Sequence, residues 1–367
     1  MKTVAIVGAG IAGLSTAWAL TRRGVPVTLY EQSDKIPNPL SASGDEHRII
    51  RRAYGHRSGY AKRIDSAYEA WESMFEDLGA NHLISNGFLI ISRELGDEAE
   101  QYRDGLLAGG YRLELMDPME ASNRFRFLED GTFRYVGFGP EGGALMSKRI
   151  AADLVAWLEK HSAELRTGTT ITNVDDEAGR VTTADGTTIS HDRIIVTAGA
   201  WLLKLRPELA TSLKTYRTAV CYLTPPDDLQ DAWADAPVIL DAGGESDGYA
   251  IPPLFGSGLK LGTGRHKWAA APDANRVASN DEHLKIRAQF SPPLARLDEY
   301  AHETTVTCAY TFTSDEHFFS RARGKTIIVS ACSGHGYKFG AAIGLRVAEA
   351  IETGNVAAMH EWLAARD

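Results

Sequence analysis

Three glycines near the start of the chain have the spacing of a phosphate-binding loop. Gly8, Gly10 and Gly13 form the pattern GxGxxG. In such a loop the first glycine permits a tight turn, the second leaves room for a pyrophosphate, and the third lets a helix pack closely on a strand. An acidic residue about 20 positions later, here Glu31, can accept hydrogen bonds from ribose hydroxyl groups. The pattern predicts a dinucleotide site, and its residues are Gly8, Gly10, Ile11, Ala12, Gly13 and Glu31.

The hydrophobic pattern supplies the elements that this loop requires. Residues 4–7 are an apolar run typical of a buried strand, residues 11–22 are helical, and residues 25–30 form a second strand. A glycine-rich turn without a ligand is the simpler alternative, but strand, helix and acid in register favour a ligand. The motif alone does not separate FAD from NAD, although its place at the start of the chain favours FAD. Thr197-Ala198-Gly199 is similar to a second element of FAD proteins, and equally to an ordinary turn.

The remaining pattern predicts two domains. Helices are expected at 63–78, 147–161 and 341–353, and strands at 87–92, 132–138, 169–174, 193–197 and 326–331. Residues 215–309 are mostly strand and loop, with one helical patch at 281–289. We therefore expect an α/β fold in which residues 1–80, 142–214 and 315–367 form a Rossmann-type domain. A strand-rich substrate domain, residues 81–141 and 215–314, is inserted between these segments.

Composition and charge argue against several classes of protein. A formal net charge of −9 disfavours a general nucleic-acid binder, which needs a basic face. No apolar run approaches the roughly 20 residues of a membrane helix, and no secretory signal is visible. Cys221, Cys308 and Cys332 form neither a disulfide framework nor a zinc spacing, so we expect no metal and a reducing cytoplasm.

Three further blocks carry a family resemblance. They are RIIRRAYG at 48–55, GLKLG at 258–262, and CAYT at 308–311, which continues through DEHF at 315–318 to SGHGYKF at 333–339. In this order they resemble the monomeric sarcosine oxidase and N-methyltryptophan oxidase group of the D-amino-acid-oxidase-like flavoproteins. The resemblance implies a GR2-like FAD-binding domain with an inserted antiparallel sheet. It also implies FAD, and oxidation of a secondary or N-methylated α-amino acid by O₂ with release of hydrogen peroxide.

Two residues take redox roles from this resemblance. Cys308 matches the cysteine that bonds covalently to the flavin 8-methyl group; without the family it would be interpreted as an inert buried thiol, as are Cys221 and Cys332. Lys260 matches a lysine that promotes reaction with O₂, because positive charge stabilises developing superoxide. From sequence alone, a surface lysine with a solvated head is an equal alternative.

The resemblance also implies a set of cationic residues. Arg51 and Lys338 match the pair that binds the substrate carboxylate, for which a guanidinium fork and an ammonium are suited. Arg48 matches an arginine beside the flavin ring, where it favours the reduced, anionic flavin. Surface salt bridging is the alternative for these arginines, and it is the preferred interpretation of Arg52.

Other positions are assigned to the cavity and the cofactor. Tyr249 and Tyr310 match aromatic residues that line the substrate cavity, although core tyrosines are an even alternative. The loop at 333–339 matches a segment under the flavin ring, where backbone N–H groups can stabilise negative charge. The cofactor residues expected in this part of the chain and in the middle strand are Val174, Gly334, Gly336, Tyr337 and Lys338.

The chain departs from the family at the amine end of the site. Gly264 and Gly44 stand where the sarcosine oxidases carry histidines, and His47 replaces a threonine; His266 lies two positions after Gly264. Glycine in place of imidazole suggests more room, and therefore a bulkier or cyclic amine, with His47 and Gly264 near the substrate. Two alternatives stay open: a flavin dehydrogenase that uses a quinone or protein acceptor, and a non-catalytic flavin-binding protein. We expect no membrane or nucleic-acid partner, and a monomer is compatible with the pattern.

Overall fold

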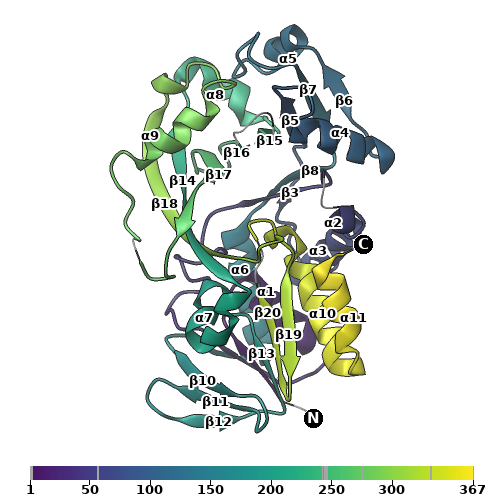
Figure 1. The fold of residues 1–367 in the computed structure, drawn as a ribbon, viewed down its shortest axis with the longest axis vertical. Helices are drawn as coiled ribbons and strands as arrows, with labels where there is room; N and C mark the ends of the chain where they lie inside the picture. The colour runs from purple at the N-terminus through teal and green to yellow at the C-terminus, as the bar shows by residue number, and fades with distance from the viewer. Residues whose placement is uncertain are drawn as a thin grey trace.

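The strands of the chain form two large sheets that lie in two parts of the molecule (Figure 1). The computed structural model describes residues 3–55, 58–241, 243, 247–274, 276–330 and 333–366. Within these residues no helix is long and apolar enough to cross a membrane. The mixed α/β fold predicted from the sequence is confirmed.

The lower part is built on a six-stranded sheet. Its strands, in order across the sheet, are β19 (Phe319–Arg323), β20 (Thr326–Ser330), β13 (Arg193–Val196), β1 (Val4–Val7), β2 (Val27–Tyr30) and β9 (Glu164–Arg166). All neighbours are parallel except β19 and β20. The central strands are apolar on both faces because both faces are covered: Val4 and Ile6 join one core cluster, and Ala5 and Val7 join another.

Helices cover one face of this sheet and a small sheet covers the other. The helices are α1 (Ile11–Thr21), α3 (Ile64–Leu78), α6 (Ser147–Lys160) and α10 (Gly340–Thr353). The opposite face carries the antiparallel meander β10 (Ile171–Asp175), β11 (Arg180–Thr183) and β12 (Thr188–Ser190) (Figure 1). The strands therefore come from the start, middle and end of the chain. The exact domain boundaries stay a prediction.

The upper part is built on an eight-stranded sheet. Its strands, in order, are β18 (Ala301–Phe312), β14 (Lys214–Thr224), β17 (Leu259–Ala269), β16 (Gly248–Ile251), β15 (Val238–Asp241), β5 (Phe88–Ser92), β7 (Tyr135–Gly139) and β6 (Glu114–Met116). The pairing is antiparallel except between β15 and β5, which run parallel. At that junction two separate stretches of the chain join one sheet.

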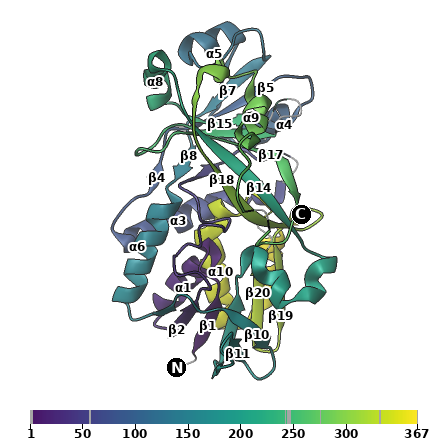
Figure 2. The same ribbon diagram turned by 90° about the vertical axis from the view of Figure 1, so that its left-hand side faces the viewer.

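Long strands and a small sheet connect the two parts. Strands β14 and β18 extend from the upper part down to the lower part (Figure 2). The arginine block, which was given no secondary structure from the sequence, forms strand β3 (Arg48–Arg51). It pairs with β8 (Gly142–Leu145), which also pairs with β4 (Leu83–Ile84). This strand positions the arginines where the two parts meet.

Candidate functional site

The glycine loop lies between the end of β1 and the start of α1. Gly8 has a φ of +103°, and a β-carbon there would lie 2.7 Å from the carbonyl oxygen of Thr197. A β-carbon on Gly13 would lie 1.9 Å from the oxygen of Gly8. Gly10, by contrast, would approach the Ser43 hydroxyl at 3.3 Å. Close backbone packing therefore requires glycine at positions 8 and 13. At Gly10, the lack of a side chain leaves space above the loop for a ligand.

The Glu31 carboxylate stabilises this loop by hydrogen bonds and also lines the cavity above it. Its carboxylate accepts hydrogen bonds from the backbone N–H groups of Ala9 at 2.8 Å and Ser33 at 3.0 Å. Burial raises the pKa of Glu31, and these backbone hydrogen bonds partly offset that effect. At the helix start, Ile11 donates its N–H to the Ser43 hydroxyl at 3.0 Å, and α1 has no acidic residue in its first turn. The positive end of the α1 dipole is therefore open to an anion.

A first cavity of about 360 Å³ opens above the glycine loop. Among the predicted residues, Gly8, Gly10, Ile11, Ala12 and Glu31 line it, together with Thr197, Ala198 and Gly199. Gly13 and Val174 do not line it; Val174 is buried in the core beneath the meander. An ADP moiety requires a helix N-terminus, a buried acid and glycines that carry no side chain. These residues therefore fit the ADP half of FAD.

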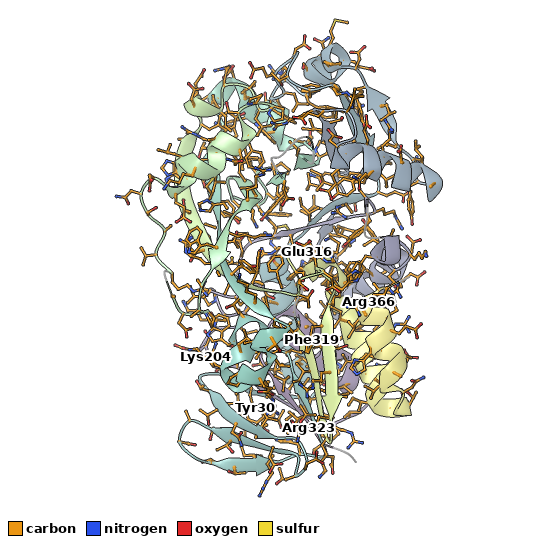
Figure 3. The ribbon with its side chains drawn as sticks, viewed as in Figure 1. Tyr30, Lys204, Glu316, Phe319, Arg323 and Arg366 are labelled. Atoms are coloured by element: carbon orange, nitrogen blue, oxygen red, sulfur yellow. The ribbon has the colours of Figure 1, made fainter. Side chains whose placement is uncertain are left out.

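A second cavity of about 310 Å³ lies where the two parts meet. The predicted residues that line it are Arg48, Arg51, Tyr249, Gly264, Tyr310, Gly334, Tyr337 and Lys338. Alternate residues of β18 line the two cavities: Ala309 and Thr311 the first, Tyr310 and Phe312 the second. Figure 3 shows Tyr30 and Lys204 of the first cavity in the lower part and Glu316 of the second nearer the middle. The cavities are therefore neighbours across one strand.

Two buried cations, Arg51 and Lys338, lie at the same aromatic ring. The Arg51 guanidinium carbon is 4.4 Å from the Tyr54 ring centroid, and the Lys338 ammonium is 5.6 Å from it. Their exposed fractions are 7% and 6%. Arg51 donates to the carbonyl of Ala53, and Lys338 donates to that of His335 at 2.9 Å. Two cations brought together in the wall of one cavity are suited to an anionic ligand group such as a carboxylate; the acids Glu98, Asp247 and Glu316 also line this cavity.

Lys260 is fully buried and pairs with a residue that the sequence analysis did not identify. Its ammonium forms an ion pair with Asp45 and donates to the carbonyl of His47 at 3.0 Å. Asp45 also accepts from the Tyr222 hydroxyl at 2.7 Å and pairs with Arg48 at 3.3 Å. Burial alone would raise the pKa of Asp45, but Lys260 and Arg48 hold it well below its usual value. The surface alternative for Lys260 is wrong, because the strand turns its side chain inward.

Tyr249 is positioned by its neighbour on the sheet. Tyr249 pairs with Gly262 on β17, and a β-carbon at that glycine would lie 2.5 Å from the tyrosine ring. The ring of Tyr249 therefore packs directly on the glycine. Burial raises the pKa of Tyr249, so its hydroxyl stays protonated at neutral pH. The ring of Tyr337 lies 5.9 Å from the Arg48 guanidinium carbon, at the same side of the cavity.

Cys308 lies on β18 beside this cluster and is 1% exposed. Burial raises the pKa of its thiol, and the charge of Arg48 partly offsets that effect. Cys221 is buried in the apolar core of the upper sheet, where burial raises its pKa to about 12. That environment favours the inert interpretation of Cys221. Cys332 lies outside the described residues.

His47 and His266 are not at the cavity surface. His47 is fully buried, hydrogen bonds Ser257 at 3.1 Å, and is absent from the residues that line the second cavity. Burial lowers its pKa to about 3, and nearby Lys260 adds to that effect. His266 instead hydrogen bonds Glu282 at 2.7 Å. The expected contact of His47 with substrate is therefore not what the structure has, because its side chain turns behind the cavity wall.

Gly264 lines the second cavity, but the space beside it is not open in the structure, and the extra room expected for substrate stays a prediction. A β-carbon at this position would lie 1.8 Å from Oδ2 of Asp247, which lines the same cavity. The Asp247 carboxylate therefore occupies the space that a side chain at 264 would take. The sequence shows that position 264 has no side chain, but it does not show which neighbour occupies that space. Asp247 lies at the end of a different strand and could not be paired with Gly264 from the sequence.

The loop at 333–339 is tied to both sides of the site. Ser333 donates its N–H to Thr311 at 3.1 Å, and Trp71 on α3 donates to the carbonyl of Lys338 at 2.7 Å. Gly334 has a φ of +77°, which favours glycine, and lines the second cavity. Gly336 belongs to the loop but does not line that cavity.

Comparisons with known proteins agree with this architecture. Residues 3–350 match a family model described as FAD dependent oxidoreductase. A monomeric sarcosine oxidase from Bacillus sp. is 26% identical over 96% of this chain and 93% of its own length. An N-methyl-L-tryptophan oxidase from Yersinia pestis is 23% identical over 92% of both chains.

Solved structures share the fold at lower sequence identity. A fructosyl peptide oxidase superposes with a TM-score of 0.84 and 19% identity, covering 100% of this chain and 94% of that one. An L-proline dehydrogenase from P. horikoshii superposes with a TM-score of 0.83 and 18% identity, covering 99% and 96%.

Proposed function

We propose, because this chain belongs to the FAD dependent oxidoreductase family, that it oxidises a secondary or N-substituted α-amino acid and passes the electrons to O₂. The observation that carries this proposal is the pair of buried cations, Arg51 and Lys338, in a cavity beside the cofactor cradle. Relatives named sarcosine oxidase and N-methyl-L-tryptophan oxidase support the same substrate class.

The cofactor and the residues of the site have separate parts in the proposed reaction. Bound FAD supplies two-electron redox chemistry, while the protein supplies position and electrostatics. Arg51 and Lys338 hold the substrate carboxylate, and Tyr249 and Tyr310 form the wall beside the amine. The substrate amine must be neutral. The substrate gives up two electrons and two protons and becomes an imine, which water hydrolyses; O₂ takes up the two electrons and two protons and becomes hydrogen peroxide.

Lys260 and Arg48 supply positive charge for the oxygen step. Electron transfer to O₂ creates negative charge, and a cation about 4 Å away at an effective dielectric constant of about 20 stabilises it by about 4 kcal/mol. Lys260→Met is therefore expected to slow reoxidation far more than reduction. Equal slowing of both half-reactions would remove this role from Lys260.

We include in the proposal a thioether between Cys308 and the flavin 8-methyl group. Its support is the burial of Cys308 near Arg48, on a strand whose later residues line both cavities; Cys308 itself is not among the lining residues. The thiol and the methyl group each lose one hydrogen when the bond forms, and O₂ takes up both as hydrogen peroxide. Acid-precipitated wild-type protein should stay yellow, as should the Cys221→Ser control, whereas Cys308→Ser should lose its colour. A colourless wild-type pellet would show that the tether does not exist.

One observation favours a second candidate, a flavin dehydrogenase with a quinone or protein acceptor. The Asp45 carboxylate offsets part of the positive charge on which an oxidase depends. The two candidates are separated by the peroxide formed per substrate oxidised in air. An oxidase gives one peroxide per turnover, while a dehydrogenase gives little peroxide and turns over only with an added acceptor.

We extend the proposal to a monomer in a reducing compartment. The support is the name of the relatives, monomeric sarcosine oxidase, and a cysteine set without a disulfide spacing. Light scattering of the purified protein measures the oligomeric state, and a stable dimer would contradict this part of the proposal.

A further inference from the structure

A buried carboxylate, Asp45, connects the two cations Lys260 and Arg48. Asp45 is 3% exposed and Lys260 is 1% exposed. The carboxylate pairs with the Lys260 ammonium and with Nη1 of Arg48 at 3.3 Å, and it accepts a hydrogen bond from Tyr222 at 2.7 Å. Ions at this depth are stable only when partners replace the lost hydration.

The loop that carries Asp45 is anchored on both sides. The Ser147 hydroxyl donates to the Asp45 carbonyl at 2.6 Å, and Ser43 accepts the N–H of Ile11 at the start of α1. The position of the carboxylate is therefore set by the cofactor domain, whereas Lys260 comes from β17 of the upper sheet. The ion pair joins the two parts of the molecule at the site.

Among the described residues, Asp45 is the anion that pairs with both Lys260 and Arg48. The titratable residues around the Lys260 ammonium are Asp45, His47, Arg48, Tyr222, Tyr249 and Cys308. Burial lowers the pKa of His47 to about 3, and burial raises the pKa values of Tyr222, Tyr249 and Cys308. These four side chains are uncharged at neutral pH, so Asp45 balances the two cations.

Removal of Asp45 would leave Lys260 and Arg48 as two buried like charges. An arginine keeps its proton under such conditions, whereas a buried lysine readily loses its proton. We infer that Asp45 is a positioning residue that keeps Lys260 protonated and holds its ammonium against the carbonyl of His47. This inference rests on the role proposed for Lys260 in the reaction with O₂.

The test compares Asp45→Asn with the neighbouring control Glu46→Gln, which removes a partly exposed acid that pairs with Lys148. Reoxidation of reduced enzyme by O₂ is measured across the neutral and alkaline range. Wild type and control should react at a constant rate through the neutral range, because burial lowers the pKa of Lys260 and the charge of Asp45 partly offsets that effect. Asp45→Asn should slow reoxidation by about tenfold for each pH unit above the lowered lysine pKa, and recover in acid. Asp45→Glu should restore much of the wild-type profile.

Sulfite affinity of the bound flavin gives a readout that does not depend on turnover. Loss of a negative charge, taken alone, should tighten binding of this anion at every pH. If the lysine also loses its proton, sulfite should bind more weakly than in wild type at alkaline pH and more tightly in acid. This crossover is the result expected for Asp45→Asn, and tighter binding at every pH would overturn the inference.

The outcomes separate the inference from the function on which it rests. If Lys260→Met does not slow reoxidation, the oxygen role of Lys260 fails, but the sulfite crossover still decides what Asp45 does. If Asp45→Asn does not fold, wild type carries the test: after correction for the ionisation of sulfite itself, its sulfite affinity should show no inflection in the neutral range. If wild type shows such an inflection and Lys260→Met does not, the titrating group is Lys260. Asp45 then does not keep that lysine protonated, and the inference is overturned.

Discussion

Arg51, the last residue of β3, and Arg52, which follows it, lie in opposite environments. Arg51 points into the second cavity, where its guanidinium stacks near Tyr54 and Tyr102. Arg52 points away and pairs with Asp65 and Glu141 at the surface. Because the strand ends at Arg51, the chain turns at Arg52 and directs that side chain away from the cavity. The two residues therefore provide a matched pair for testing the carboxylate anchor.

Arg51→Ala should weaken carboxylate inhibitors by about 2–5 kcal/mol, as expected when one partner of a buried charged contact is lost. The Arg52→Ala control removes an equal charge from the next residue in the chain and should leave the inhibitor Kd nearly unchanged. Titration of the flavin absorbance measures both constants. Similar losses in the two variants would indicate a general electrostatic effect instead of a carboxylate anchor.

The site residues were predictable to different degrees. The cradle glycines and Glu31 follow from local spacing, because strand, turn and helix are consecutive in the chain. Arg51 and Lys338 could be paired only through the family resemblance, since they are brought together by the fold. Asp45 and Asp247 were missed because their roles depend on partners from distant strands, Lys260 and Gly264. An acid three positions before Arg48 was the available signal for Asp45.

At the scale of elements, the contact between α1 and α10 joins the first and last cofactor-binding segments. A β-carbon on Gly344 would lie 2.3 Å from the backbone oxygen of Ser15, and one on Gly340 would lie 2.4 Å from the Ile11 side chain. Glycine at these positions lets the two helices approach closely. The start of α10 thereby holds the loop at 333–339 in place.

Gly344→Ala should destabilise the protein by about 1–3 kcal/mol, because backbone atoms must move to accommodate the methyl group. Glu349→Ala, on the exposed side of the same helix, should cost less than about 0.5 kcal/mol. Urea unfolding measures both values. A Gly344→Ala variant as stable as wild type would mean that the helices are not closely packed at this point.

A buried ion cluster ties α9 (Glu282–Arg287) to the upper sheet. Glu282 pairs with Arg217 on β14 and with His266 on β17. Burial alone would raise the pKa of Glu282, but its hydrogen bonds to Arg217 and His266 lower it from 4.5 to about 2. A carboxyl whose pKa is depressed in the folded state stabilises the fold above its unfolded pKa. That stabilisation is lost as the pH falls from 4.5 to about 2.

Glu282→Gln should therefore lower the free energy of unfolding at neutral pH by about 3–5 kcal/mol, because Arg217 is left without its counter-charge. The difference from wild type should shrink as the pH falls through that window. Glu72→Gln, at an exposed position on α3, is the control and should have little effect at any pH. A difference that stays constant down to acid pH would contradict the assigned ionisation.

Elements with a clear hydrophobic period were predictable, and irregular ones were not. The helices predicted at 63–78, 147–161 and 341–353 are confirmed as α3, α6 and α10 to within one residue at each end. Helices α8 (Asp227–Ala234) and α11 (Val356–Ala364) were missed. Helix α8 begins with two acidic residues and buries only Leu229 and Trp233, so its apolar stripe is too short for a periodic signal.

At the scale of the whole molecule, cofactor and substrate spaces are built by different parts of the chain. The first cavity is lined mainly by the lower part, and the second by strands of the upper part together with β3 and the loop at 333–339. Strand β18 contributes to both and carries Cys308. Substrate choice can therefore change in the upper sheet without disturbing the glycine cradle.

This flavoprotein is proposed to oxidise amino acids that have a substituted amine and a free carboxylate. Anaerobic mixing with matched compounds tests this proposal most directly. N-substituted α-amino acids should bleach the flavin absorbance, while the same amines without the carboxylate should not, and Arg51→Ala should lose the distinction. Equal bleaching by the compounds with and without the carboxylate would contradict the proposed function. So would the absence of bleaching by every N-substituted amino acid in a broad panel.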